Sequence, residues 1–111
     1  MHRLRHWRSL PQILKEINLY DNQLDSIPPQ IFRIKNLQKL YLDDNKIKTI
    51  SHDVGELKNL EFLSIVQNGL VSIPEEIKKL KLLTTFCCLY DNALDEASVE
   101  ITQELGNIVQ G

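Results

Sequence analysis

The chain has 111 residues, of which 42% are hydrophobic, and it carries a formal net charge of −2 at pH 7. This length suits a single domain with one apolar core, and so small a net charge excludes a general attraction to nucleic acid or to an anionic membrane. No stretch approaches the ~18 consecutive apolar residues of a membrane-spanning helix, so we expect no membrane contact.

Residues 1–13 precede the repeats described below and include the basic segment MHRLRHWRSL. Because no apolar stretch follows this segment, it does not match a secretory signal peptide. We expect residues 1–13 to form an N-terminal cap, in which Leu4 and Trp7 cover the open edge of the first repeat. His2 and His6 lie four residues apart, but no third metal ligand is near them in the sequence, so we expect solvated side chains and no metal site.

Residues 14–94 repeat one sequence motif. Its first three copies are LKEINLYDNQL from Leu14, LQKLYLDDNKI from Leu37 and LEFLSIVQNGL from Leu60. An asparagine therefore recurs at a constant interval, as Asn22, Asn45 and Asn68. A period of this size indicates units that bury their apolar faces only by stacking on their neighbours, so it predicts a solenoid.

Each copy reads LxxLxLxxNxL, which resembles the leucine-rich repeat signature. The resemblance implies an α/β fold: a right-handed solenoid of about four repeats, with a parallel sheet on the concave face and short helices or turns on the convex face. The segments between the copies, IPPQIFRI from Ile27 and IPEEIKKL from Ile73, resemble the 23-residue class of Ras-suppressor and Scribble-like intracellular proteins and of bacterial leucine-rich repeat proteins.

Alternating apolar residues predict a short strand in each copy. In the second copy Leu40 and Leu42 point into the core, which leaves Tyr41 pointing outward. The asparagine after the strand carries both a donor and an acceptor, and it can pair backbone groups that are buried between neighbouring repeats. We therefore expect a structural ladder made of Asn22, Asn45, Asn68 and Asn92. The segments between the strands have apolar residues spaced by four and three, which predicts short helical turns with one inward stripe.

The fourth copy contains one extra residue, because the step from Asn68 to Asn92 is longer by one than the step from Asn45 to Asn68. Its turn, CLYDNAL, closely matches NLYDNQL of the first copy, so we favour the register that follows the turn. That register points three residues inward, Thr84, Cys87 and Leu89, and three outward, Phe86, Cys88 and Tyr90. The alternative register keeps Leu83 and Phe86 in the core and requires a bulge at Cys87 or Cys88.

Residues 95–111 are expected to form a helix that caps the last repeat. Asp95 is suited to begin the helix and Gly106 to end it. The inward stripe of this helix is predicted to consist of Ala97, Ile101 and Leu105. The chain thus divides into an N-terminal cap (1–13), the repeats (14–94) and a C-terminal capping helix (95–111).

The outward positions of the strands and of the turns after them are expected to form the concave face, in four columns. From strand entry to strand exit the columns are Glu16, Lys39, Phe62 and Phe86; Asn18, Tyr41, Ser64 and Cys88; Tyr20, Asp43, Val66 and Tyr90; and Asp21, Asp44, Gln67 and Asp91. Five of the seven aromatic residues of the chain lie in these columns. Apolar anchors inside a polar rim are typical of a protein-binding patch.

Two interpretations of this face stay open. The aromatic residues either bind a partner or stabilise the sheet by cross-strand pairing, at about 0.2–1 kcal/mol per pair. The acidic exit column either attracts a partner with Lys or Arg beside its apolar contacts or is ordinary turn chemistry. We favour binding, because a phenylalanine such as Phe62 gains little by facing water.

Catalytic chemistry is not indicated by the sequence. There is no glycine-rich phosphate loop, and Cys87 and Cys88 are not paired with a histidine base, so we expect no enzymatic activity and no cofactor. These two cysteines are the only ones, and neighbours on a strand point to opposite faces and pair poorly, which favours a reducing, cytoplasmic location.

We therefore expect a non-enzymatic module that binds a protein or peptide on the concave face. One alternative is a regulatory repeat subunit that assembles with a separate signalling enzyme. Another is a self-associating structural protein, because the basic residues near the start and the acidic residues after position 90 could stack head to tail. A monomer is favoured over an oligomer.

Overall fold

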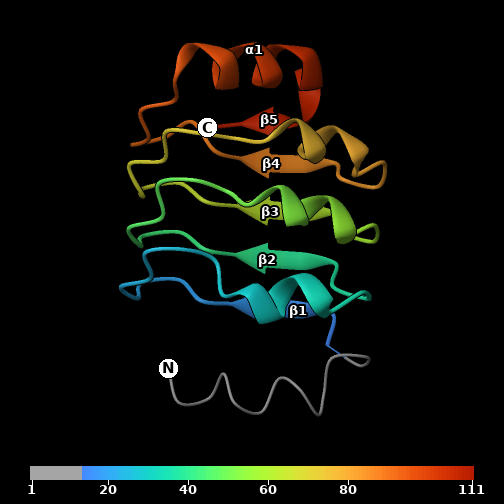
Figure 1. Ribbon diagram of the computed structural model, residues 1–111. Coiled ribbons are helices and arrows are strands. Elements are labelled where there is room, and N and C mark those ends of the chain that lie inside the picture. Colours follow the sequence, from blue (N-terminus) through green and yellow to red (C-terminus); the bar gives the residue numbers. More distant parts are fainter. Residues whose placement is uncertain (1–13) are drawn as a thin grey trace.

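Each repeat contributes one short parallel strand to a single sheet. In the computed structural model, which describes residues 14–111, the sheet has the order β1-β2-β3-β4-β5 (Figure 1). Every pair of neighbouring strands is parallel. The strands are β1 (Glu16–Asn18), β2 (Lys39–Tyr41), β3 (Phe62–Ser64), β4 (Thr85–Cys87) and β5 (Val109–Gln110).

A short 3-10 helix returns the chain from each of the first three strands to the next. The helices are η2 (Pro29–Arg33), η3 (His52–Glu56) and η4 (Glu75–Lys79). Proline suits the start of η2 and η4 because the first N–H groups of a helix have no partner inside it. In η3 the hydroxyl of Ser51 takes over this role and accepts a bond from the Asp53 N–H at 3.0 Å.

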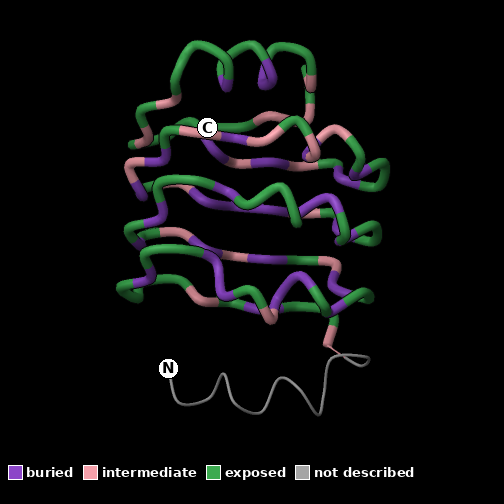
Figure 2. Tube along the Cα trace, viewed as in Figure 1, coloured by how far each residue is buried: buried purple, intermediate pink, exposed green. Residues whose placement is uncertain are grey.

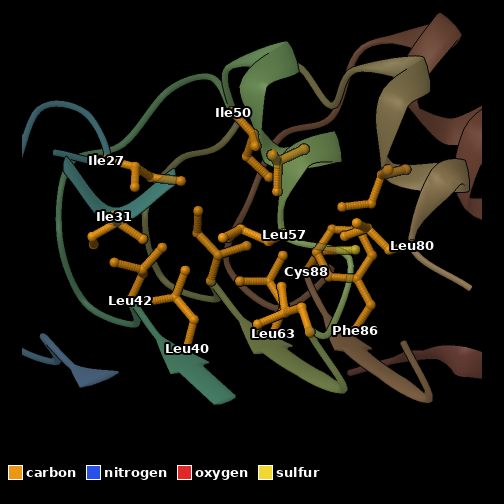
Figure 3. Packing of buried hydrophobic residues seen from close by; sticks show 14 of the residues in the cluster. Ile27, Ile31, Leu40, Leu42, Ile50, Leu57, Leu63, Leu80, Phe86 and Cys88 are labelled. Carbon is orange, nitrogen blue, oxygen red and sulfur yellow. The ribbon is translucent and has the colours of Figure 1, made fainter. Parts of the chain in front are cut away.

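The core lies between the layer of strands and the layer of 3-10 helices (Figure 3). Its central column consists of the middle residues of successive strands, Leu40, Leu63 and Phe86, all of which are fully buried. From the other layer Ile31, Val54 and Ile77 fill the opposite side. Burial of such a side chain contributes about 1.5–3 kcal/mol relative to exposure. Figure 2 shows buried and exposed segments alternating along each coil of the described chain.

The favoured register of the fourth repeat is wrong. Phe86 and Cys88 are completely buried, whereas Leu89 is 46% exposed. Thr85 pairs with Phe62 across the sheet, so the spacing of the earlier strands continues unchanged into β4. The alternative register, with Leu83 and Phe86 in the core, is the observed one. The physical reason is volume, because Phe86 and Leu83 fill the core far better than Cys87 and Thr84 would in the same two places.

The extra residue of the fourth repeat is Leu89. In the second repeat the N–H of Asp44, the residue before the ladder asparagine, donates to the carbonyl of Val66 in the third repeat at 3.0 Å. The corresponding residue of the third repeat, Gln67, donates to the carbonyl of Tyr90 in the fourth repeat at 3.0 Å. Tyr90 thus takes the place of Val66, and Leu89 is the inserted residue. The bulge lies just after Cys88, later than either alternative assumed, where an added side chain meets solvent and not the core.

Helix α1 (Glu96–Leu105) closes the C-terminal end of the stack (Figure 1). Asp95 begins it and accepts a bond from the Ser98 N–H at 2.9 Å. The predicted inward stripe is only partly right: Ala97 is exposed, and the buried residues are Ser98, Ile101 and Thr102. Ser98 is buried because its hydroxyl accepts a bond of 2.8 Å from the Ile73 N–H and so satisfies a backbone group of the third repeat.

The helix ends at Gly106 as predicted, but the residues that follow, which were assigned with it to a capping helix over 95–111, do not continue it. Gly106 adopts a φ of 71°, which reverses the chain after Leu105. A turn, η5 (Gly106–Ile108), then leads into β5, which pairs with β4 and adds a fifth strand to the sheet. The helix is tied to the repeats by Lys78 of η4, which forms ion pairs with Glu75 at 2.8 Å and with Glu104 of α1.

Some expectations concern residues that are not described. The N-terminal cap over residues 1–13, with Leu4 and Trp7, lies outside the described residues, and so do His2 and His6. In the part of the chain that is described, no helix has the length and apolar character needed to cross a bilayer.

Candidate functional site

The candidate site is the outer surface of the sheet, which we call the sheet face: the outward side chains of β1 to β4 together with those of the turns that follow them. The strand register aligns its first column as Glu16, Lys39, Phe62 and Thr85, and its second as Asn18, Tyr41, Ser64 and Cys87. Thr85 and Cys87 thus occupy the places that the sequence analysis assigned to Phe86 and Cys88.

A signal for the correct register was present in the sequence. Leu83 follows Leu60 by the full repeat period, and Phe86 follows Leu63 by the same interval. Giving the apolar residues precedence over the turn motif places Thr85 and Cys87 outward. Thr85 and Cys87 are partly exposed, so the fourth strand presents a hydroxyl and a thiol where a second exposed phenylalanine was expected.

Tyr41 and Phe62 form an aromatic pair near the middle of the sheet face. Their ring centroids are 5.1 Å apart and the ring planes are tilted by 41°. A pair of this geometry contributes about 0.5–1.5 kcal/mol beyond its area burial. Both side chains nevertheless remain partly exposed. The pair therefore stabilises the junction of β2 and β3 and still offers apolar surface to solvent.

Asp43 links the second and third repeats on the exit side of this pair. Its Oδ1 accepts a bond from the Ser64 hydroxyl at 2.6 Å and another from the Val66 N–H at 2.9 Å. Ser64, although it points to the outer side of the sheet, is only 5% exposed. The carboxylate of Asp43 thus has a structural role in addition to its place on the surface.

The fourth column adopts an unusual backbone conformation. Its residues all have a positive φ, between 55° and 60°: Asp21, Asp44, Gln67 and Asp91. Aspartate and asparagine enter this left-handed region more readily than most residues because their short polar side chains can bond locally. Turn geometry therefore accounts for the choice of aspartate here, yet all four side chains are exposed.

Three asparagines hold these turns in place: Asn45 and Asn68, which are buried, and Asn92, which is partly buried. The side-chain amide of Asn68 donates to the carbonyls of Leu42, Ile65 and Val66 at 3.0–3.1 Å, while its oxygen accepts from the Ile47 N–H at 3.0 Å. Asn45 makes the corresponding bonds one repeat earlier. Asn92 bonds the carbonyls of Ile65 and Cys88 and the N–H groups of Asn68 and Leu70.

Asn22 differs from the other three asparagines. It is exposed, and among residues 14–111 it donates only to the nearby carbonyls of Leu19 and Tyr20, at 2.8 and 3.2 Å. The internal members of the ladder therefore join adjacent repeats, whereas Asn22 shapes its own turn. Through these bonds the ladder aligns the exit sides of all four repeats, which positions the third and fourth columns of the sheet face.

Large apolar or aromatic side chains are exposed at the strand exits of the first and fourth repeats, the two ends of the stack. Tyr20 stands in the first repeat, and Leu89 and Tyr90 stand in the fourth, all of them exposed. The Leu89 and Tyr90 N–H groups both donate to the carbonyl of Gly111 at 2.9 Å, so the inserted residue is held by the residue that follows β5. Val66 lies between these ends and is partly exposed.

The two cysteines of β4 and its turn have different environments. Cys87 is partly exposed on the sheet face, whereas Cys88 is buried, and both are free. Burial, together with the neighbouring Cys87, raises the pKa of the Cys88 thiol to about 12. Cys88 therefore behaves as an inert apolar side chain near neutral pH. Within residues 14–111, no three His, Cys, Asp or Glu side chains are grouped so that they could hold a metal ion.

Comparison with known proteins agrees with this geometry. A family model described as "Leucine rich repeat" matches residues 12–84, so the chain belongs to the leucine-rich repeat family. Members of this family are generally protein-binding modules and typically not enzymes. No curated protein matches the chain.

The fold also matches a solved bacterial structure. A leucine-rich repeat protein of Leptospira interrogans is 29% identical in sequence and aligns with a TM-score of 0.79. The alignment covers 89% of this chain but only 25% of the Leptospira chain. This chain therefore corresponds to about a quarter of that protein, and the two share the stacked-repeat architecture.

Proposed function

We propose that this chain is a non-enzymatic protein–protein interaction module that binds a protein or peptide on its sheet face. The observation that carries the proposal is the pair Tyr41 and Phe62, which stays partly exposed at the middle of the face. Polar and charged side chains surround the pair, among them Lys39 and Asp43. An apolar centre with a polar rim is the usual anatomy of a protein-binding surface.

The size of the face limits what can bind. Adjacent strands of a sheet are about 4.8 Å apart, so β1 and β4 are about 14 Å apart. A surface of this width accommodates one extended peptide or the edge of a small domain. Interfaces of such limited area are commonly weak or transient, so we expect a modest affinity.

A cytoplasmic location is part of the same proposal. It is supported by the cysteines, because Cys87 faces the outer side of the sheet and Cys88 the core. Side chains that point to opposite sides of a strand are poorly placed for a disulfide. A protein that keeps both thiols reduced suits a reducing compartment.

Replacing Tyr41 and Phe62 by alanine tests the proposal. The double variant and the parent chain are immobilised and used to capture partners from a native lysate, and the captured proteins are compared by mass spectrometry. The matched control is Leu82→Ala, because Leu82 is an exposed apolar residue that lies outside the sheet face. We expect the double variant to lose captured proteins that the control retains.

Stability has to be measured alongside capture. The alanine variants lose the aromatic pair, so their melting temperature will fall slightly, and capture is therefore performed well below it. Unchanged capture by a folded double variant would mean that the aromatic pair only stabilises the sheet. In that case the proposed binding face would be rejected.

A further inference from the structure

The charges on the sheet face are distributed unevenly between its two sides. At the strand entries both signs are present, as in Glu16 and Lys39. At the strand exits four aspartates lie along one side of the sheet face, in the first, second and fourth repeats. We call this group the acidic edge: Asp21, Asp43, Asp44 and Asp91. The Asp21 N–H donates to the Asp43 carbonyl at 3.0 Å, so the turns of successive repeats are in direct contact.

Among the described residues, no counter-charge is paired with the acidic edge. The ion pairs within residues 14–111 involve Lys35, Lys78 and His52, and none of them includes an aspartate of this edge. Lys48, on the loop beside the edge, directs its ammonium to the carbonyl of Asn68 at 3.2 Å. Lys46 is exposed nearby and reduces the local negative charge only in part.

Apolar side chains lie next to part of the acidic edge. Val66 stands beside Asp43, whose carboxylate accepts from the Val66 N–H, and Tyr41 and Phe62 lie on the strands that lead into these turns. The inserted Leu89 and its neighbour Tyr90 extend this apolar surface at the fourth repeat. Apolar side chains next to carboxylates that have no ion-pair partner within residues 14–111 are complementary to a segment that is apolar and basic.

We propose that the occupant of the sheet face is an extended partner segment that crosses the strands along the acidic edge, with two basic residues four positions apart and an apolar residue midway between them. This inference rests on the proposed function and specifies its ligand. Asp21 and Asp91 are separated by three strand spacings, about 14 Å, and an extended chain covers about 13 Å in four residues.

Alternate side chains of an extended segment point to the same side. The two basic residues therefore face the Asp21–Asp44 end and the Asp91 end, and the apolar residue between them meets Val66 and the aromatic pair. The side chains of lysine and arginine are long enough to adjust to the exact spacing. In this arrangement the burial of the apolar residue provides most of the affinity, and the aspartate carboxylates provide specificity for a basic segment.

Fluorescence anisotropy with short labelled peptides tests this assignment. The first probe has the sequence Ser-Lys-Ser-Leu-Ser-Lys-Ser, and the second carries glutamate in place of both lysines. We expect the lysine probe to bind the parent chain at least tenfold more tightly than the glutamate probe at low salt. The difference should shrink as salt is added, because exposed charges are screened.

Two triple variants test whether the turn aspartates are responsible for the preference for the lysine probe. The first replaces the turn aspartates by asparagine, Asp21→Asn, Asp44→Asn and Asp91→Asn, which keeps a residue that tolerates a positive φ. The control removes three carboxylates elsewhere, Asp53→Asn, Glu76→Gln and Glu100→Gln, so both variants lose the same net charge. We expect the first variant to weaken the lysine probe at least fivefold and the control to change its affinity less than twofold.

The outcomes separate this inference from the proposed function. Equal binding of both probes, or equal loss in both triple variants, would overturn the inference. If the glutamate probe binds and Phe62→Ala abolishes that binding, the sheet face binds peptides but the assigned chemistry is wrong. Binding by neither probe also rejects the inference, whereas the proposed function then depends only on the capture experiment.

Self-association is checked on the same samples by sedimentation velocity. A dimer that forms with the parent chain, disappears in the turn variant and excludes the lysine probe would show that a second copy occupies the acidic edge. That result would replace the partner segment by the chain itself and overturn the inference. A monomer that binds the lysine probe supports it.

Discussion

The hydroxyl of Ser64 donates a 2.6 Å hydrogen bond to the carboxylate of Asp43 in the preceding repeat, and so joins two coils on the outer side of the sheet. The same oxygen accepts from the Val66 N–H at 2.9 Å. Asp43→Ala removes the acceptor of both donors, so we expect it to lower the free energy of unfolding by about 1–3 kcal/mol. Urea unfolding measures this loss. Asp43→Asn retains an oxygen and should cost less than half as much, and an equal cost would contradict the hydrogen-bond explanation.

The asparagine ladder predicts a sharp contrast between two chemically identical substitutions. Asn68 is buried and bonds backbone groups of two repeats, so Asn68→Ala leaves several of them unpaired, at about 1–3 kcal/mol each before relaxation. Asn22 is exposed and, within the described part of the chain, bonds only its own turn, where water can replace it. Chemical denaturation should therefore show a loss at least twice as large for Asn68→Ala. Similar losses at the two positions would contradict a ladder that joins repeats.

The register of the fourth repeat can be tested with two phenylalanines. Phe86 is fully buried in the core, so Phe86→Ala should cost about 3–5 kcal/mol through lost burial and a residual cavity. Phe62 is partly exposed, and its replacement should cost markedly less. The comparison requires only thermal or urea unfolding of both variants. The opposite order would restore the register in which Phe86 faces outward.

The start of α1 should respond to acid in a specific way. Hydrogen bonds from the side chain and the backbone N–H of Ser98 lower the pKa of Asp95 below its ordinary value of 3.8. A carboxylate with a lowered pKa stabilises the fold fully above its unfolded pKa, and this contribution is lost as the pH falls through the folded pKa. The difference in melting temperature between the parent and Asp95→Asn should therefore be constant near neutral pH.

That difference should shrink as the pH falls below about 4 and through the folded pKa. Scanning calorimetry over this range of pH measures it, and Glu96→Gln serves as a nearby control that makes no such cap. A difference that does not change with pH would show that the charge of Asp95 does not contribute to capping.

Thiol reactivity should distinguish the adjacent cysteines. Cys87 is partly exposed, whereas burial raises the pKa of Cys88 to about 12, so Cys88 has almost no thiolate near neutral pH. A thiol reagent such as Ellman's reagent should modify one thiol quickly in the native chain and both after denaturation. Cys87→Ser should abolish the fast reaction, and Cys88→Ser should preserve it. A fast reaction that survives in Cys87→Ser would contradict the observed burial.

Much of the fold could be predicted because its information is local and repeated. The alternation around Tyr41 specifies a strand, and the constant repeat period specifies which strands are neighbours, so the parallel sheet followed from the spacing. The inward position of Leu40 and Leu63 followed for the same reason. Each unit is too small to bury its own apolar residues, which makes stacking the one arrangement that such a sequence can adopt.

The candidate site was less predictable, since exposure depends on neighbours in space. Ser64 was expected on the surface, but the bond to Asp43 and the adjacent repeats leave it almost inaccessible. Asp44 and Asp91 were expected at the strand exits and are exposed there, yet their left-handed backbone became visible only in three dimensions. These aspartates therefore both adopt the left-handed backbone that the turn requires and place a negative charge on the surface.

The amino-acid sequence by itself determined the solenoid, its period and the columns of the first three repeats, because these depend on contacts that every repeat makes in the same way. Only the tertiary structure decided the end of the stack: the phase of Phe86, the bulge at Leu89, the buried face of α1 and the strand β5. These features depend on which side chain fills a particular volume and which carbonyl is left to accept a bond, and such requirements arise only once the repeats are in contact.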